Sequence, residues 1–321
     1  MPAYDEEKLR QAQAASLDIL LEVDRICRAH GIQYLLDAGT LIGAVRHQGF
    51  IPWDDDIDIA MTRENFDRFV AVLRGEKERQ YRGAGRTRRT GKRQPGSKLP
   101  ASSGPAAALG PSDRLPDSME LVLPNEYRGG RAFYDFTPRI LYKPSRRHTD
   151  SRETKYYEGK LNHLWVDIFI LDAIPDQPLL DHLTRFLQKC IYGCSMPRRF
   201  ALDFSKYGTA DRMKVRILAG LGRLFRMPEL FALQDRLSRR FNGRRKPTKR
   251  LYYSNYQPDY LQVTLLRSWC EQTVELPFEG HSLMAPAGYD AVLREIYGDY
   301  QKLPPEAERV PSHSDDLEVL G

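Results

Sequence analysis

The acidic run WDDDIDI, residues 53–59, contains the residue types best suited to chemistry. Residues two apart in a β-strand point to the same face, so Asp54, Asp56 and Asp58 are predicted to line one side of a strand while the isoleucines enter the core. Three like charges on one face repel, and a divalent cation between them removes that repulsion. Hard cations such as Mg²⁺ combine carboxylates with the phosphate oxygens of a substrate. The spacing therefore predicts a metal site that handles a phosphorylated compound.

Two other interpretations of this run are an EF-hand loop and a solvated strand edge. The aspartates fit the first ligand positions of an EF-hand loop, but Ile59 stands where glycine is needed and Asn65 where a bidentate glutamate is needed. A solvated acidic strand edge is the second alternative. The flanking Phe50, Ile51 and Trp53 favour burial instead.

A further carboxylate, Asp167, lies within the apolar run LWVDIFIL at residues 164–171, which predicts a buried strand. A charge in such a strand is costly unless it is paired or bound to a metal, so Asp167 is either a ligand or the partner of a local Arg or Lys. The ligand interpretation is preferred. Asp172 is the fallback, although an aspartate just before Pro175 is commonly a turn former.

Gly39 and Thr40 precede the acidic run and lead into the short helical stretch LIGAVRH. Backbone N–H groups and a hydroxyl at a helix start can bind phosphate. Arg46 and His47 are the predicted cationic or hydrogen-bonding partners of a diphosphate. The segment is not a P-loop, because no Gly-Lys-Ser/Thr follows.

The elements that position these residues are predicted to alternate between helix and strand. Apolar residues recur at helical spacing from Leu9 to Cys27, and His30-Gly31 is predicted to end that helix. A short strand is predicted at residues 32–37, and Thr62 is predicted to cap a helix that runs to Leu73. Beyond residue 178 the pattern is mainly helical.

Residues 74–98 hold ten Lys or Arg against two Glu, so this segment exceeds the net charge of +6 of the whole chain. From about residue 74 to residue 118 the chain is rich in Gly, Pro, Ser and Arg without periodicity, which predicts a disordered basic insertion. A second basic run, residues 236–250, has eight Lys or Arg and no acidic residue. The basic balance of the chain therefore comes mostly from one insertion.

Composition and cysteine usage indicate a globular protein of a reducing compartment. No run approaches the roughly 20 apolar residues of a membrane span, and the N-terminus is acidic and polar, unlike a signal peptide. The four cysteines form no CxxC pair, so buried or idle thiols are expected rather than a disulfide framework or a zinc ribbon. A cytoplasmic location is expected.

The stretch LLDAGTLIGAVRHQGFIPWDDDIDIAM, residues 35–61, closely resembles the signature of the LicD family of cholinephosphotransferases, relatives of the fukutin-type ribitol-phosphate transferases. The segment VDIFILDAIPD, residues 166–176, resembles that family's second acidic strand. Residues 274–313 resemble its closing region. The resemblance covers most of the chain apart from the insertion and the basic helical part.

The resemblance implies an α/β fold with a nucleotidyltransferase-like core, in which helices flank a mixed sheet. Residues 1–180 are expected to form this catalytic core, and residues 181–321 a mainly helical C-terminal region that completes the substrate site. Carried over by position, Asp56, Asp58 and Asp167 bind Mg²⁺ or Mn²⁺, and Gly39-Thr40 holds phosphate.

The activity implied by the resemblance is metal-dependent transfer of phosphocholine, or a related alcohol phosphate such as ribitol phosphate. The donor is expected to be CDP-activated, and the acceptor a hydroxyl of a cell-surface glycan or its lipid-linked precursor, with release of CMP. Asp54 and Asp58 are both candidates for the base that takes the hydroxyl proton, because distance decides before pKa does.

Two rival functions stay open at this point. A true nucleotidyltransferase would use an NTP and release pyrophosphate, and the acidic residues alone do not exclude it. A nucleic-acid or membrane-surface binder would use the basic runs, but that function leaves the acidic run unexplained. No nucleic-acid partner is expected, and the basic runs are interpreted as solvated surface or as a peripheral contact with the inner face of a membrane.

Several aromatic residues of the C-terminal region have two interpretations. They could form a cage for a quaternary ammonium group or pack in the core, and core packing is preferred. These residues are Tyr252, Tyr253, Tyr256, Tyr260 and Trp269.

Overall fold

The computed structural model describes residues 4–75, 113–131, 135–148, 162–198, 208–311 and 317–320. The predicted basic insertion falls mostly on residues 76–112, which lie outside the described residues. Its disorder therefore stays a prediction.

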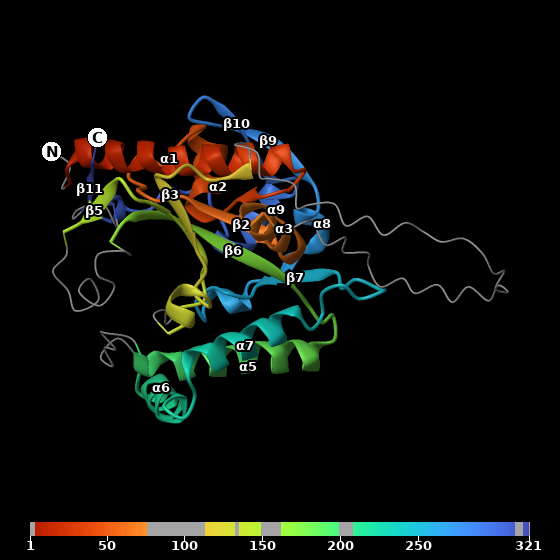
Figure 1. Cartoon of the computed structure of the whole chain (residues 1–321). Coiled ribbons are helices and arrows are strands. Elements are labelled where there is room, and N and C mark those ends of the chain that lie inside the picture. Colours follow the sequence, from red (N-terminus) through yellow and green to blue (C-terminus); the bar gives the residue numbers. More distant parts are fainter. Residues whose placement is uncertain are drawn as a thin grey trace, which may run out of the picture.

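A mixed β-sheet forms the centre of the molecule (Figure 1). Its strands follow the order β1 (Leu35–Leu36), β2 (Asp58–Thr62), β6 (Leu164–Ile174), β4 (Arg139–Tyr142), β3 (Met119–Val122), while β7 (Arg250–Tyr253) pairs with both β6 and β8 (Leu265–Leu266). Only the β2–β6 pair is parallel among the described pairs. The expected α/β class with a mixed sheet flanked by helices is confirmed.

The long helix α1 (Glu6–Ala29) matches the predicted apolar stripe and packs on β6 and β4. Asp5 caps its start by accepting hydrogen bonds from the N–H groups of Glu7 and Lys8, and Gly31 follows its end with φ +59°. Helix α3 (Arg63–Leu73) begins at the predicted cap Thr62, whose own hydroxyl accepts from Asn65 Nδ2 at 3.1 Å rather than from the helix backbone.

The acidic run is not a strand over its whole length. Pro52 lacks an N–H group, and Asp54 N donates to Ile51 O at 2.8 Å, which closes a turn. Gln13 Nε2 then donates to Asp54 O at 2.8 Å and holds the loop against α1. Strand β2 therefore begins only at Asp58, and the predicted strand over residues 53–57 is wrong.

The C-terminal region contains most of the remaining helices. They are α5 (Pro178–Ser195), α6 (Thr209–Gly222), α7 (Met227–Arg239), α8 (Arg267–Cys270) and α9 (Tyr289–Tyr297). Short 3₁₀ turns occupy Tyr127–Gly129, Met196–Arg198, Tyr260–Gln262 and Glu306–Glu308. Helices α5, α6 and α7 lie on the opposite side of the sheet from α1 (Figure 1). No helix in the described part of the chain is long and apolar enough to cross a bilayer.

Strands of the C-terminal region tie it to the first half of the chain. β7 joins the central sheet, and β11 (Leu317–Val319) pairs with β5 (Ser145–Arg147). β9 (Thr273–Phe278) and β10 (His281–Pro286) form a hairpin, and its Phe278 and Leu283 share one buried cluster with Ile19 of α1. The boundary at residue 180 stays a prediction, and the core crosses it. As expected, Cys27, Cys194 and Cys270 are buried free thiols.

Candidate functional site

A row of three charged side chains crosses the centre of the sheet. Asp58 of β2 is paired in register with Asp167 of β6, and Asp167 is paired in register with Arg139 of β4. Neighbouring strands lie about 4.8 Å apart, and residues in register point to the same face. The sheet therefore places the carboxylates of Asp58 and Asp167 next to each other, although 108 positions separate them in the sequence.

The loop before β2 adds Asp54 and Asp56 to this row. These two carboxyl groups lie close together, and after burial it is the charge and a hydrogen bond of Asp56 that raise the pKa of Asp54. Gly39 allows the loop to approach, since a Cβ atom at that position would lie 2.5 Å from Asp54 Oδ2. The four predicted acidic residues are thus gathered in one region from two strands and a loop.

Helix α2 (Ala38–His47) begins beside the acidic residues. Thr40 is buried in its first turn, and its Oγ1 accepts a hydrogen bond from Asp58 N at 2.9 Å. Asp37 N donates to Asp58 O at 3.1 Å, so the start of β2 is held from both sides. In the structure Gly39 and Thr40 are therefore helical residues that position Asp54 and Asp58, and their predicted contact with phosphate stays a prediction.

Asp37 is a buried carboxyl group that was not singled out from the sequence. The phenol of Tyr253 donates to Asp37 Oδ1 at 2.8 Å. Burial raises the pKa of Asp37 to about 6, against hydrogen bonds from Tyr253 and from the backbone of Ala38 that lower it. Its sequence position, at the end of a short apolar strand and before a glycine, is also typical of an ordinary turn.

Burial and mutual repulsion raise the pKa values of the clustered carboxyl groups when no cation is bound. Burial, followed by the charges of Asp56 and Asp167, raises the pKa of Asp58 well above its ordinary value. Burial and the adjacent Asp56 likewise raise the pKa of Asp54. The pKa of Asp167 is also raised by burial, although the guanidinium of Arg139 opposes the rise. Such a cluster gains most from a divalent cation.

The donor set fits a hard cation such as Mg²⁺ or Mn²⁺, because every candidate ligand is a carboxylate oxygen. Within the ranges that the structure describes, no three acidic, His or Cys side chains converge as a finished metal site. The oxygens of Asp167 accept hydrogen bonds from Arg139 Nε and from Trp165 Nε1, each at 3.2 Å. Both predicted alternatives for Asp167 are therefore represented: it has a local arginine partner, and it lies next to Asp58.

A pocket of about 180 Å³ opens over the acidic residues. Its polar wall contains Asp56, Asp58, Asp167 and Arg147, and its apolar wall contains Leu164, Trp165, Phe169 and Tyr256. The side chain of Asp167 is still 25 % exposed, so its carboxylate remains accessible at the pocket.

Trp165 lies between two arginines at this pocket. The guanidinium carbons of Arg139 and Arg147 each lie 4.8 Å from its ring centroid. These distances are typical of cation–π contacts, which hold an arginine in place without consuming its hydrogen-bond donors. Neither arginine was singled out from the sequence, because each becomes a neighbour of the acidic row only through pairing of β4 with β6 and the position of β5.

The remaining predicted residues lie elsewhere. Arg46 and His47 occupy the last turn of α2, about 12 Å along the helix axis from its start, and neither lines the pocket. Arg46 Nη1 donates instead to Tyr300 O at 2.9 Å. Tyr252 and Tyr253 are fully buried, in line with the preferred core interpretation, whereas Tyr256 reaches the pocket.

Asp172 is not a turn former, and that interpretation is wrong. It lies in β6 as a fully buried carboxylate that accepts hydrogen bonds from Arg63 Nε at 2.9 Å and from Ser254 Oγ at 2.5 Å. Although burial raises the pKa of Asp172, the charge and hydrogen bonds of Arg63 and Ser254 outweigh burial and hold it below the ordinary value. Asp172 is therefore a structural ion-pair partner on the strand that carries Asp167.

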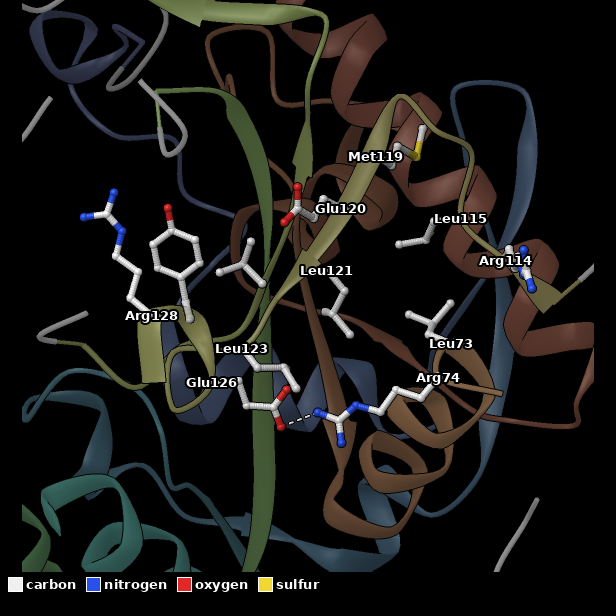
Figure 2. A pocket seen from close by; sticks show the side chains of 12 residues that line it. Leu73, Arg74, Arg114, Leu115, Met119, Glu120, Leu121, Leu123, Glu126 and Arg128 are labelled. Atoms are coloured by element: carbon white, nitrogen blue, oxygen red, sulfur yellow. Dashed lines mark hydrogen bonds and ion pairs between the residues drawn. The ribbon is translucent and has the colours of Figure 1, made fainter. Parts of the chain in front are cut away.

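A separate and larger pocket of about 800 Å³ lies beside β3 and the end of α3 (Figure 2). An ion pair between Arg74 and Glu126 spans one side of it, and leucines such as Leu73 and Leu121 point into it. Its lining shares no residue with the acidic pocket. Its size does not make it the reaction site, because it holds none of the clustered carboxylates.

Comparison with known proteins agrees with the geometry. Residues 31–99 match the family described as LicD/FKTN/FKRP, nucleotidyltransferase domain. Over 97 % of its length the chain is 27 % identical to the lipopolysaccharide cholinephosphotransferase LicD of Haemophilus influenzae, of which it covers 98 %. It is 38 % identical over 68 residues to the human ribitol 5-phosphate transferase FKRP, which corresponds to 20 % of this chain and 14 % of that one.

A third relative, an uncharacterized protein of Rickettsia typhi, is 37 % identical over 76 residues, or 23 % of this chain and 25 % of that one. The family match begins just before β1 and includes α2, the acidic loop, β2 and α3, which are the elements that hold Asp54, Asp56 and Asp58. The chain is therefore similar to LicD over nearly its whole length, and residues 31–99 match the nucleotidyltransferase domain that the LicD/FKTN/FKRP description names.

Proposed function

We propose that the acidic pocket transfers a substituted phosphate, with phosphocholine as the first candidate, from a CDP-activated donor to a hydroxyl of a glycan. The observation that carries the proposal is the in-register pair Asp58–Asp167, which lines one pocket together with Asp56 and Arg147. The names of the relatives support the class of reaction, because one is a cholinephosphotransferase and another a ribitol 5-phosphate transferase.

Asp56, Asp58 and Asp167 are the proposed ligands of Mg²⁺ or Mn²⁺. The ion would neutralise charge on the donor's diphosphate and on the departing CMP. Asp167 can act as a ligand through its remaining lone pairs, or it can release Arg139 Nε, now 3.2 Å away, when the ion binds. Arg139 stays near because it stacks on Trp165, and it is then available to a phosphate oxygen.

Arg147 is the second proposed phosphate contact. It lines the pocket, and its stacking on Trp165 orients the guanidinium at little entropic cost. The two guanidinium groups would bind the diphosphate beside the carboxylates, Arg147 from the pocket wall and Arg139 from its position next to Asp167. Arg46 and His47 are too far along α2 to share this role from their present positions.

Asp54 is the proposed base for the acceptor hydroxyl. Asp58 is committed to the row with Asp167, whereas Asp54 is held in the loop against Gly39. The side chain of Asp54 is only partly buried, so an acceptor hydroxyl can approach it. A positioned carboxylate of this kind moves one proton and makes no covalent bond to the substrate.

The apolar wall of the pocket supports choline as the transferred alcohol. Phe169 lies 4.1 Å from Tyr256 between ring centroids, and Tyr256 lies 4.1 Å from Tyr260. Tyr256 and Phe169 line the pocket together with Trp165. Aromatic faces attract a quaternary ammonium group, and they offer much less to a polyhydroxy alcohol such as ribitol.

The test is ³¹P NMR of the purified protein with Mg²⁺ and CDP-choline, CDP-ribitol or CDP-glycerol in turn, with candidate glycan acceptors present. Metal-dependent release of CMP from one donor is expected, and Asp56→Asn should lose it by orders of magnitude while the fold survives. Asp117→Asn removes an exposed aspartate as a matched control. Pyrophosphate released from an NTP would identify a nucleotidyltransferase instead, and near-normal turnover by Asp56→Asn would overturn the metal assignment.

A further inference from the structure

Helix α5 has its apolar side toward solvent. Leu179 is 80 % exposed and Phe186 62 % exposed, and Leu183 is also exposed on the same stripe. These positions follow the i, i+4, i+7 spacing of one helix face. The opposite face of α5 is polar and buried, which reverses the usual arrangement of a surface helix.

The buried face of α5 fixes this orientation through paired polar groups. Asp181 forms ion pairs with Arg185 and with Arg250 Nη2, the latter at 2.6 Å. Gln188 Nε2 donates to Ser238 Oγ at 2.8 Å and to Tyr252 Oη at 3.0 Å. Turning the leucines inward would expose or unpair these groups, so the exposure of the apolar stripe is a specified feature of the fold.

Helix α6 carries a second exposed apolar stripe. Met213 is 63 % exposed, and Ile217 and Leu221 follow it at four-residue spacing. The two helices pack closely, because Gly222 of α6 lies directly against the backbone of Cys194 in α5. Leu224, just beyond α6, is 79 % exposed. We call Leu179, Leu183, Phe186, Met213, Ile217, Leu221 and Leu224 the α5–α6 apolar face.

The apolar residues of α6 are accompanied by positive charge. Residues 209–226 contain five Lys or Arg and one acidic residue, Asp211, which pairs with Lys214 at 3.0 Å. Arg216, Arg223 and Arg226 are exposed along the same segment. Exposed Leu, Phe, Ile and Met beside Lys and Arg are the combination found in helices that lie on anionic bilayers.

We infer that the α5–α6 apolar face binds peripherally to a membrane that carries anionic lipids. Proteins rarely expose this many large apolar side chains on two neighbouring helices unless these side chains meet a partner. A second copy of the chain would bring the same positive segment to the interface, whereas anionic headgroups complement that charge. The face thus differs from the basic runs, residues 74–118 and 236–250, from which membrane contact is expected in the sequence.

This membrane contact is a binding property and stands apart from the proposed transferase activity. In Figure 1, α5 and α6 lie far from α1 and from the N-terminus, at one end of the molecule. Bilayer binding there would leave the opposite end of the molecule in water. Loss of vesicle binding and loss of CMP release are therefore separate measurements, and failure of one does not imply failure of the other.

The experiment is co-sedimentation of the full chain with vesicles of phosphatidylglycerol and phosphatidylcholine, compared with vesicles of phosphatidylcholine alone. Binding to the anionic vesicles is expected, and it should weaken as salt is added. The double variants Leu179→Ser/Phe186→Ser and Met213→Ser/Ile217→Ser should each reduce partitioning by about tenfold or more. Lys214→Gln/Arg223→Gln should reduce binding to the anionic vesicles only.

The matched control is Leu303→Ser/Leu320→Ser, which removes two exposed leucines outside the face and should leave partitioning unchanged. Circular dichroism and urea unfolding check that each variant folds. Vesicle binding that is absent in the wild type, or equal in the face variants, overturns the inference. A wild-type dimer in sedimentation velocity that the face variants dissolve also overturns it, because the face would then join two copies of this chain.

Discussion

Gly39 controls the position of one carboxylate by having no side chain. A Cβ atom there would lie 2.5 Å from Asp54 Oδ2, a contact that forces Asp54 to move. Asp54 is also hydrogen-bonded to Asp56, so its displacement disturbs both acidic residues. We expect Gly39→Ala to lower turnover more than tenfold, while the free energy of unfolding changes by only about 1 kcal/mol. CMP release and urea unfolding of the purified variant measure the two effects.

Gly220→Ala is the control for this substitution. Gly220 lies in α6 with nothing within 4 Å of an added Cβ atom, so alanine should be neutral or stabilise the helix by about 0.5–1 kcal/mol. Equal turnover in Gly39→Ala and Gly220→Ala would show that the position of Asp54 does not matter for the reaction.

Asp37 should make stability depend on pH near neutrality. Its pKa is raised to about 6 in the folded protein by burial, whereas an unfolded aspartate titrates near pH 3.9. The stability that it contributes is therefore complete below about pH 4 and lost as pH rises through 6. Without added metal, Asp37→Asn should gain about 3 kcal/mol relative to the wild type between pH 4 and pH 8. Urea unfolding at the two pH values tests this, and a constant difference would contradict it.

At the scale of elements, the buried pair Arg63–Asp172 joins α3 to β6. Asn242 also donates to Asp172, so groups from three parts of the chain converge on one carboxylate. Asp172→Asn leaves the buried Arg63 with the half-exposed Asp235, 3.5 Å from its Nη1, as its anionic partner and should cost about 3 kcal/mol at pH 7. Because the pKa of Asp172 is lowered in the folded state, this difference should shrink as pH falls through about 4.

Chemical unfolding of wild type and variant over this pH range measures the prediction. The wild type loses the contribution of the ion pair on acidification, and the variant has none to lose. A difference that stays the same from pH 7 to pH 3 would show that folding does not lower the pKa of Asp172.

Strand β5 positions Arg147 on Trp165. Substitutions of Arg147 can separate the effect of this stacking on donor binding from the effect of the positive charge. Arg147→Lys keeps the positive charge but loses the planar stack, and Arg147→Met loses both. We expect KM for the donor to rise in both variants, and more in the methionine variant, with a smaller change in kcat. Arg146→Met is the control, because Arg146 is exposed on the same strand. An unchanged KM in Arg147→Met would remove Arg147 from donor binding.

Local sequence patterns predicted the elements whose apolar spacing is long and regular. The stripe from Leu9 to Cys27 indicated α1, and the run around Asp167 indicated β6. The secondary structure of the acidic run could not be predicted in the same way, because alternation of Asp and Ile is equally compatible with a strand and with a loop held by side chains. Pro52 and the hydrogen bond from Gln13 to Asp54, 41 positions away in the sequence, stabilise the loop conformation.

At the scale of the whole molecule, the binding of a cation should appear as stability. A divalent ion between the clustered carboxylates relieves the repulsion that, together with burial, raises the pKa of Asp58. We expect the thermal unfolding midpoint of the wild type to rise with Mg²⁺ or Mn²⁺, with a gain of about 2.7 kcal/mol at a hundred times Kd. Asp56→Asn should lose most of this gain and Asp117→Asn none of it. Equal shifts in all three proteins would place the ion elsewhere.

The arginines of the candidate site could not be predicted from local sequence, because tertiary contacts bring them to the carboxylates. Asp58 and Asp167 could be chosen because a charge within an apolar strand is unusual wherever it occurs. Arg139 and Arg147 carry no such local signal in a chain with 49 Lys or Arg. They join the site only because β4 pairs with β6 and because Trp165 offers two faces. Asp172 was misjudged for the same reason, since its partners come from distant segments.

Strand β6 carries two charges with different tasks. Asp167 and Asp172 are five residues apart, so they point to opposite faces of the sheet. Asp172 can reach Arg63, Ser254 and Asn242 in only one alignment of the strand. A slip by one residue would bring an apolar neighbour to those partners and move Asp167 away from Asp58. The ion pair of Asp172 on one face of β6 thus fixes the register that places Asp167 beside Asp58 on the other face. An insertion between the two aspartates would disrupt both the ion pair and the position of Asp167.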